Sequence, residues 1–447
     1  MSPSTSLPPA PELDAHHYNL SKGERTRLTW SLLSGFTVLN FAYAGLAAVL
    51  LPAQVFLVDS NPVSAQANMG MIMSVSAFVT IFVQPIFGQI SDQTRHRWGR
   101  RAPWMCFGAV TGALCLLAIG HLTTVVLLLA AWILIQVFLN VFQIGMTAWL
   151  PDRVEPERRG TVSAFIGIGG QVGGAVGVIV AAWFALPNLI WWGYSLIAIL
   201  VVVTALAVIL LNADKDNRAM PREPFKMSAF WKGFWISPKT APDFWWVFFA
   251  RAVLILGYWG INVNQRYLLQ FFYKVGDGLA ADEQAAKLGS AQQVASILTL
   301  VAALAVNATM GPLSDKLGRR KPFVIVSSLV MVAAFAVMLL VPNLVGFYIG
   351  TAVLGLGFGC YMSIDMALAS QVIPVREEAG KAMGMMNIAM NVPQMLAPLL
   401  ASFLVVMFQT GSGDTLDTAP GYAALFIVGI VLMAIAAAMI HPVKSVK

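Results

Sequence analysis

Long apolar segments alternate with short polar ones along the whole chain. Each apolar segment is roughly 20 residues long or longer, which is enough for a helix to cross about 30 Å of hydrocarbon. Because lipid offers the backbone no hydrogen-bonding partner, segments of this kind are expected to be α-helices. The pattern predicts twelve membrane spans, at residues 28–57, 66–90, 103–120, 123–149, 160–186, 190–211, 244–273, 286–310, 322–341, 343–372, 380–408 and 420–440.

Two polar loops half a chain apart carry the same residues in the same order. The first reads GQISDQTRHRWGRRAP at 88–103, and the second reads GPLSDKLGRRKP at 311–322. Their Gly-x-x-Ser-Asp residues match at an offset of 223 positions, and Gly-Arg-Arg follows in both. A second pair of loops, 151–160 and 374–381, begins at the same offset. The repeats predict an all-α membrane protein with twelve transmembrane helices in two pseudo-symmetric six-helix halves.

The pattern also divides the chain into domains. We expect a disordered cytoplasmic tail without a cleaved signal peptide, because the first residues are polar and contain Pro and Ser. In the central linker Phe and Trp interleave with Lys, which predicts a helix lying in the headgroup region; binding of a regulatory partner is the alternative. The predicted parts are the tail 1–27, a six-helix bundle 28–211, the cytoplasmic linker 212–243, a second six-helix bundle 244–441 and a cytoplasmic tail 442–447.

Composition and charge narrow the class of protein. The 447 residues are 58% hydrophobic and only 11% charged, a balance that leaves a soluble domain without polar cover. The net charge of +7 does not indicate nucleic acid. Every Lys and Arg lies in tails or alternate loops on one side, except Lys274, Lys287, Arg251 and Arg266. This positive-inside asymmetry predicts a multi-pass plasma (inner) membrane protein with both termini in the cytoplasm, in contact with membrane lipid.

Other functional classes leave no signature in the sequence. The five His residues are scattered without metal-ligand spacing, and no P-loop is present. The three Cys lie in apolar segments and are expected to pack without forming disulfides. We therefore expect neither an enzyme nor a cofactor, and we expect the chain to act as a monomer.

The repeated loops carry a resemblance to a known family. Gly-x-x-x-Asp followed by Gly-Arg-Arg, found after the second and the eighth helix, resembles the major facilitator superfamily over residues 28–441. The longer first copy and the segment YMSIDMAL at 361–368 resemble the glycoside-pentoside-hexuronide/cation symporter group, in its sucrose/maltose-type proton symporter branch. Plant sucrose symporters carry an acidic residue in helix four, whereas the predicted helix four of this chain has none. The resemblance implies alternating access, with gating loops in which acid–arginine contacts brace helix ends: Asp92, Arg100, Arg101, Asp315, Arg319 and Arg320.

Asp365 is a candidate coupling residue because of its depth. It alone among the 21 Asp and Glu lies in the middle of a predicted span, nine residues before Pro374, or about 13 Å from that helix end. An ionised Asp there costs about 2.5–3.5 kcal/mol, so it needs a wet cavity, a cation or a proton. The alternative is a structural Asp paired with Arg266. Arg251 is expected to extend its charge toward the headgroups.

Uncharged polar residues follow helical spacing in five predicted helices. Spacing of three and four residues places each set on one face, which must turn away from lipid. Amides both donate and accept hydrogen bonds, so they suit hydroxyl groups. Hydrogen bonding between helices is the alternative for each amide. Arg266 is a candidate cavity cation, which leaves an anionic sugar open. The candidate substrate-binding residues are Asn40, Tyr43, Asn140, Gln143, Tyr258, Asn262, Gln265, Tyr361, Asn387, Asn391 and Gln394.

Together these features predict a secondary active transporter. The expected function is proton-coupled uptake of a neutral glycoside, a di- or small oligosaccharide, by alternating access about a midplane site. Sodium is the alternative coupling ion. A drug or cation efflux antiporter of the same superfamily is the alternative transporter, and a non-transporting membrane receptor is the alternative of another class.

Overall fold

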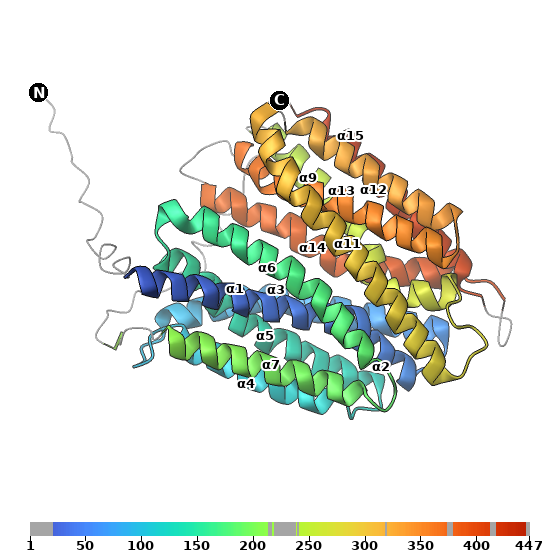
Figure 1. Cartoon of the computed structure of the whole chain (residues 1–447), viewed down its shortest axis with the longest axis horizontal. Helices are drawn as coiled ribbons and strands as arrows, with labels where there is room; N and C mark the ends of the chain where they lie inside the picture. The colour runs from blue at the N-terminus through green and yellow to red at the C-terminus, as the bar shows by residue number, and fades with distance from the viewer. Residues whose placement is uncertain are drawn as a thin grey trace, which may run out of the picture.

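The computed structural model describes residues 21–212, 217–218, 238, 241–317, 320–372, 379–411 and 417–443, and these are almost entirely helical (Figure 1). Twelve helical segments are long and apolar enough to cross a membrane, as predicted. The elements of the first half are α1 (Lys22–Gly45), the π-helix η2 (Leu46–Leu50), α2 (Leu51–Val58), α3 (Pro62–Gln93), α4 (Ala102–Ile119), α5 (Val125–Arg153), α6 (Pro156–Trp183) and α7 (Ile190–Leu211). Those of the second half are α9 (Pro242–Asn262), α10 (Gln265–Tyr267), the π-helix η3 (Leu268–Phe272), α11 (Ala281–Leu317), α12 (Lys321–Leu340), α13 (Leu344–Gln371), α14 (Ala379–Phe408) and α15 (Ala419–Ile440).

Local sequence signals fix many helix starts. The side chain of Asn61 accepts hydrogen bonds from the backbone N–H groups of Val63 and Ser64, and Pro62 occupies the first turn of α3. Thr124 and Asn343 cap α5 and α13 in the same way. Such side chains satisfy backbone donors that have no partner inside the helix, so the polar turns set where each span begins.

Several helices extend a few residues beyond the predicted spans, such as α11 at both ends, and two differences change the predicted organisation. The first helix begins at Lys22, so residues 22–27 are helical rather than part of a disordered tail, because Ser21 and Glu24 form a capping box that extends the helix beyond its apolar segment. The seventh span is broken, since α9 ends at Asn262 and α10 and η3 follow it. The predicted interfacial helix of the linker lies outside the described residues, as do 1–20 and 444–447.

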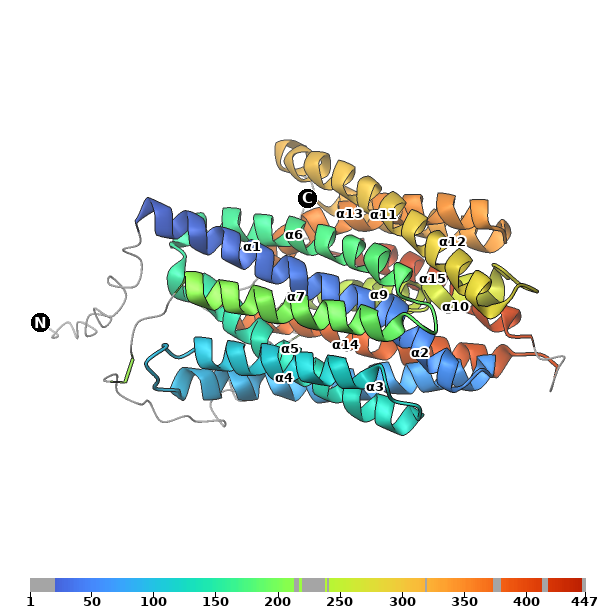
Figure 2. The same cartoon turned by 60° about the horizontal axis from the view of Figure 1, so that its bottom comes forward.

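The two six-helix halves lie side by side with their helices roughly parallel to one long direction (Figures 1 and 2). They meet mainly where α3 packs on α14 and α6 packs on α11. Large apolar side chains remain exposed on the outer surface, such as Leu210 and Leu340 at 75% and 77%. An exposed apolar surface of this kind is what lipid covers in a membrane protein.

The contact between the halves is uneven along its length. The chain crosses twelve times, so α1 begins and α15 ends on one side, which we call the terminal side. Most hydrogen bonds between the halves in the described residues lie toward the opposite side, because most of their residues stand in the first part of α3, α11 or α15, in α10, or near the ends of α2, α6 and α14. The donors on that side are Gln66, Ser74, Tyr267, Gln292, Gln293, Ser402 and Tyr422. Closer to the terminal side, Asn307 Nδ2 donates to Gln171 Oε1 at 3.0 Å.

Candidate functional site

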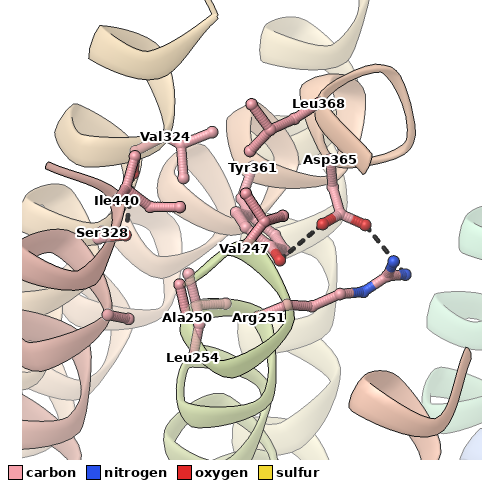
Figure 3. Close-up of a pocket in the computed structure, with 11 residues that line it drawn as sticks. Val247, Ala250, Arg251, Leu254, Val324, Ser328, Tyr361, Asp365, Leu368 and Ile440 are labelled. Atoms are coloured by element: carbon pink, nitrogen blue, oxygen red, sulfur yellow. Dashed lines mark hydrogen bonds and ion pairs between the residues drawn. The ribbon is translucent and has the colours of Figure 1, made fainter. Parts of the chain in front are cut away.

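A buried ion pair lies inside the second half, between α9 and α13 (Figure 3). Arg251 Nη2 is 3.0 Å from Asp365 Oδ2, and the two side chains are 3% and 2% exposed. The hydroxyl of Tyr361 donates to Asp365 Oδ1 at 2.7 Å. Tyr361 and Asp365 are four residues apart on α13, so they share one helix face. The carboxylate predicted from its depth therefore has a cation on one oxygen and a hydroxyl on the other.

The two helices that carry this pair are held mainly by other neighbours. α9 packs against α14 and α15, and α13 packs against α11 and α12. Long side chains span the space between α9 and α13: the Arg251–Asp365 pair and, farther from the terminal side, the rings of Tyr258 and Phe358, which stack at 3.7 Å between centroids. The ion pair therefore joins two helices that share little other contact.

The environment of Arg251 is polar on one side only. Its Nη2 lies 3.4 Å from the sulfur of Met390 on α14, whereas Nε and Nη1 have no hydrogen-bond partner in the part of the chain that the structure describes. A small cavity adjoins the pair, and Val247, Leu254, Ser328 and Ile440 contribute to its lining. Unpartnered N–H groups of a buried guanidinium are costly, so this arrangement depends on the attraction of Asp365.

The proposed alternative partner of Asp365 is wrong. Arg266 lies beyond the end of α9 near the opposite side, where its Nη1 donates to Gln292 Oε1 at 3.4 Å and the residue is only 5% exposed. Arg251 stands nine residues into α9 from the terminal side, and Asp365 stands six residues before the end of α13 on that side. Antiparallel helices bring these two to the same depth. Arg251 is also buried rather than extended toward headgroups.

The predicted amide residues fall into two environments. Asn40, Asn387 and Asn391 are exposed although they lie well inside their helices. Asn140 is buried, where its Oδ1 accepts from Gln84 at 3.3 Å and its Nδ2 donates to the carbonyl of Gln136 at 2.8 Å. Gln143, Asn262, Gln265 and Gln394 are half-buried. The side chains of Asn387 and Asn391 are accessible to a solute, whereas Asn140 already has partners within the first half; Asn40 is exposed, but its Nδ2 donates to the carbonyl of Phe36 at 2.9 Å.

Of the aromatic candidates, Tyr258 and Tyr361 lie in the second half, on α9 and α13, and Tyr43 lies on α1 of the first half. Asn262 Nδ2 donates to the hydroxyl of Tyr258 at 3.3 Å, and Tyr258 is buried against Phe358. The hydroxyl of Tyr43 is buried without a hydrogen-bond partner in the described residues. Tyr361 binds Asp365, so its hydroxyl is tied to the acid. Sequence reasoning missed Phe358, because an apolar residue in an apolar helix gives no signal.

The first gating loop forms a compact charge network on the terminal side. Arg101 Nη2 is 2.6 Å from Asp92 Oδ1, and Arg100 Nη2 is 2.8 Å from Asp152 Oδ2. Arg101 Nε is also 3.4 Å from Asp152, and Arg101 Nη1 donates to Ser91 Oγ at 3.1 Å. Asp152, on the last turn of α5, was not among the predicted residues, although it belongs to a sequence segment that repeats. In the second copy the side chain of Asp315 and the whole of Arg319 lie outside the described part; Arg320 directly precedes α12.

Comparison with known proteins identifies a matching family and similar proteins. The model of the MFS/sugar transport protein family matches residues 32–391. A lactose permease of Leuconostoc lactis is 26% identical over 188 residues, which cover 36% of this chain and 29% of the permease. A lactose permease of Lactobacillus delbrueckii subsp. bulgaricus is 24% identical over 217 residues, 43% of this chain and 33% of the permease. The alignments thus span about a third or less of these relatives.

Solved structures agree on the fold. A bacterial homologue of the human lysosomal transporter Spinster, inward-facing and unoccupied, has a TM-score of 0.69 at 13% identity, over 94% of this chain and 97% of that one. The nucleoside transporter NupG has a TM-score of 0.68 at 16% identity, over 93% and 99%. The matched relatives are transporters rather than enzymes, as predicted. Since the family model covers well over half of the residues, this protein belongs to the MFS/sugar transport protein family and has the major facilitator fold.

Proposed function

We propose that this sugar transporter is a proton-coupled symporter that takes up a neutral glycoside, a di- or small oligosaccharide. The terminal side would face the cytoplasm, in keeping with the positive-inside asymmetry of the sequence. The observation that carries the proposal is the buried ion pair of Asp365 with Arg251, with Tyr361 on the second carboxylate oxygen. It supplies one titratable group inside the membrane, set between two helices that can respond to its charge.

The pair offers a physical route from protonation to movement. A carboxylate at this depth is disfavoured unless it is paired or takes up a proton. In the ionised form Arg251 holds α9 to α13. A proton on Asp365 removes the attraction for Arg251, while Tyr361 can still hydrogen-bond to the neutral acid. The buried guanidinium then has no counter-charge. A rearrangement of α9, or new partners in the cavity, would lower the energetic cost of this unpaired charge.

Alternating access fits the uneven contact between the halves. Gln66 and Gln292 are buried between the halves near the opposite side, both 0% exposed, whereas Asn387 and Asn391 on α14 are exposed. A structure closed on the opposite side and open to the cytoplasm would have this distribution. In that state a sugar would reach the exposed amides from the terminal side, and closure there would place it near Asp365.

The substrate class follows from the chemistry of the exposed groups and from the relatives. Amides pair well with sugar hydroxyls because each can both donate and accept. Two relatives are named lactose permeases, which supports a disaccharide. Arg266 is buried and Arg251 is paired, so neither offers a free cation to an anionic sugar in this state. The family assignment likewise favours sugar transport over an efflux antiporter.

Uptake into proteoliposomes tests the proposal. A panel of labelled sugars is offered under a pH gradient, under a sodium gradient and under neither. We expect accumulation of a di- or small oligosaccharide under the pH gradient alone. Sodium-driven accumulation would replace the proton by sodium, and accumulation of only charged solutes would overturn the neutral glycoside.

One variant separates coupling from binding in the same vesicles. Asp365→Asn keeps the shape and hydrogen-bonding capacity of the side chain but cannot exchange a proton. We expect it to abolish gradient-driven accumulation while equilibrium exchange of sugar continues. Accumulation at the parent level would remove Asp365 from the coupling mechanism.

A further inference from the structure

The side chain of Gln66, in the first half, is buried among residues of the second half, near the side of the molecule opposite the terminal side. Gln66, on the second turn of α3, has an exposed fraction of 0%. Its Nε2 donates to Asn264 Oδ1 at 2.6 Å and lies 3.3 Å from Ser402 Oγ. Its Oε1 accepts from the hydroxyl of Tyr422 at 3.0 Å, and its backbone carbonyl accepts from Ser402 Oγ at 2.8 Å. We call Asn264, Ser402 and Tyr422 the Gln66 socket.

The socket is assembled from three separate parts of the second half. Asn264 follows α9, Ser402 lies on α14 and Tyr422 lies on α15. All three are buried, with exposed fractions of 2%, 6% and 0%. Asn264 is itself oriented by a hydrogen bond from its Nδ2 to the carbonyl of Gly260 at 2.7 Å. The polar atoms of Gln66 thus find partners in a buried site to which the second half contributes three elements.

The backbone of α3 is shaped to permit this approach. At Gly70, one turn after Gln66, a Cβ atom would stand 2.0 Å from Ser402 Oγ and 3.0 Å from the carbonyl oxygen of Pro398. Any larger residue there would push α3 away from α14. Gly70 therefore allows the close packing that brings Gln66 within hydrogen-bond distance of its socket.

A neighbouring contact uses a backbone group that proline leaves free. Pro52 has no N–H, so the carbonyl of Ala48, four residues earlier, loses its usual α-helical donor. Gln292 Nε2 of the second half donates to this carbonyl at 2.9 Å, and Tyr267 Oη donates to the carbonyl of Pro52 at 3.1 Å. The same side of the molecule thus carries a second set of buried hydrogen bonds between the halves.

We propose that Gln66 and its socket form a state-selective latch that holds the opposite side closed. The latch rests on alternating access as proposed above, but on neither the sugar nor the proton. Opening on this side separates α3 from α14, and water then solvates both Gln66 and the socket. Without the Gln66 amide, the socket groups would be unsatisfied in the closed state only, because the open state hydrates them. The equilibrium between the states would therefore shift toward opening on this side.

Distances between two spin labels on the opposite side test the latch. One label is placed at Ser60, between α2 and α3, and the other at Leu279, before α11; both are exposed and belong to different halves. The three native Cys are replaced, and the purified full chain is measured without sugar at one pH. We expect Gln66→Leu to raise the ratio of the long-distance to the short-distance population by roughly tenfold to hundredfold, given several buried hydrogen bonds lost in one state.

The chain offers a matched control for a lost glutamine. Gln54 is 4% exposed near the same side, and its Nε2 donates to the carbonyls of Ile119 and Leu122 at 2.9 and 3.2 Å. These partners belong to its own half, so Gln54→Leu is expected to leave the distance distribution unchanged even if it destabilises the protein. An equal shift in Gln54→Leu, or a parent distribution in Gln66→Leu, would overturn the latch.

A milder variant decides the question if Gln66→Leu does not fold. Tyr422→Phe removes only the hydroxyl that donates to Gln66 and keeps the ring. It should shift the populations in the same direction, by a few-fold. A parent distribution in Tyr422→Phe would contradict the proposal. Because no sugar and no gradient are used, a failure here is distinct from a failure of the proposed coupling or substrate.

Discussion

Two acid–arginine contacts in this protein have similar distances and a buried arginine, but their acids have opposite surroundings. Asp92, at the end of α3, and Arg101, directly before α4, lie 2.6 Å apart, and Asp365 and Arg251 lie 3.0 Å apart between α9 and α13. The Asp92 side chain is 53% exposed, whereas that of Asp365 is 2% exposed. Exposed pairs contribute about 0–1 kcal/mol, but removing one partner of a buried pair costs about 3–5 kcal/mol. Distance alone therefore does not rank the two contacts; the surrounding medium does.

The internal repeat sharpens this contrast. The Asp…Gly-Arg-Arg loop is present in both halves, but the buried pair is present in one. By the loop offset of 223, Asp365 corresponds to Phe142; by the offset of 219 between the caps Thr124 and Asn343, it corresponds to Met146. Both are fully buried apolar residues of α5. The halves therefore share their loops, while in the described residues only the second half carries a buried acid–arginine pair between its helices.

The largest expected effect is the removal of Arg251. Arg251→Met leaves Asp365 buried without its cation, and we expect the free energy of unfolding to fall by about 3–5 kcal/mol. Unfolding of the purified protein in detergent measures this change. Arg251→Met combined with Asp365→Asn should recover most of the loss, because no charge then remains buried. A double variant as unstable as the single one would show that Arg251 acts by packing rather than by charge.

The next prediction concerns an effect of intermediate size. It tests whether the contrast between exposed and buried charged groups also holds for amides. Asn387 is exposed, whereas Asn140 is buried and bonded to Gln84 and Gln136. Asn387→Ala should weaken sugar binding by about 1–3 kcal/mol with little change in stability, since it leaves a cargo hydroxyl unpaired. Asn140→Ala should weaken binding less and destabilise the protein more. Binding titrations and unfolding curves on both variants measure the difference, and unchanged affinity in both would remove these amides from the sugar site.

Within the charge network of the first gating loop, we expect substitutions of Arg101 and Arg100 to differ in their effect on stability. Arg101 is 7% exposed at its side chain and contacts Asp92, Asp152 and Ser91. Arg101→Ala leaves those groups without a shared donor, so we expect a loss of about 1–2 kcal/mol in the free energy of unfolding. Arg101→Lys, which keeps the charge but not the fork of donors, should recover only part of it. Full recovery by Lys would show that charge alone matters.

The sequence predicted the fold well because its signals are local. Span length and the repeated loops, for example 88–103, depend on neither packing nor register. Asp365 was found for the same reason, since an acid at membrane depth is conspicuous in an apolar helix. Its cation partner was not predicted, and the alternative pairing with Arg266 was wrong, because the choice between Arg251 and Arg266 depends on where the seventh span starts and breaks.

Contacts between the halves could not be predicted from the sequence. Gln66 is one polar residue near the start of a helix, and nothing nearby in the chain distinguishes it from a solvated position. Its role depends on Asn264, Ser402 and Tyr422, which follow it by 198, 336 and 356 residues. Asp152 was likewise passed over, since its arginine partners come from the loop before α4.

The smallest expected effect on stability is that of removing Arg100. This substitution separates an effect on stability from an effect on transport turnover. The side chain of Arg100 is 37% exposed and lies 2.8 Å from Asp152 and 3.9 Å from Asp92. Arg100→Ala should lower the free energy of unfolding by less than about 1 kcal/mol, and added salt should erase that difference by screening. If the loop braces helix ends in one state, Arg100→Ala should still lower transport turnover while sugar affinity stays the same. The combination with Arg319→Ala, the matching position of the second loop, should lower turnover further. Parent turnover in both variants would leave these arginines only the role of holding the loops on the cytoplasmic side.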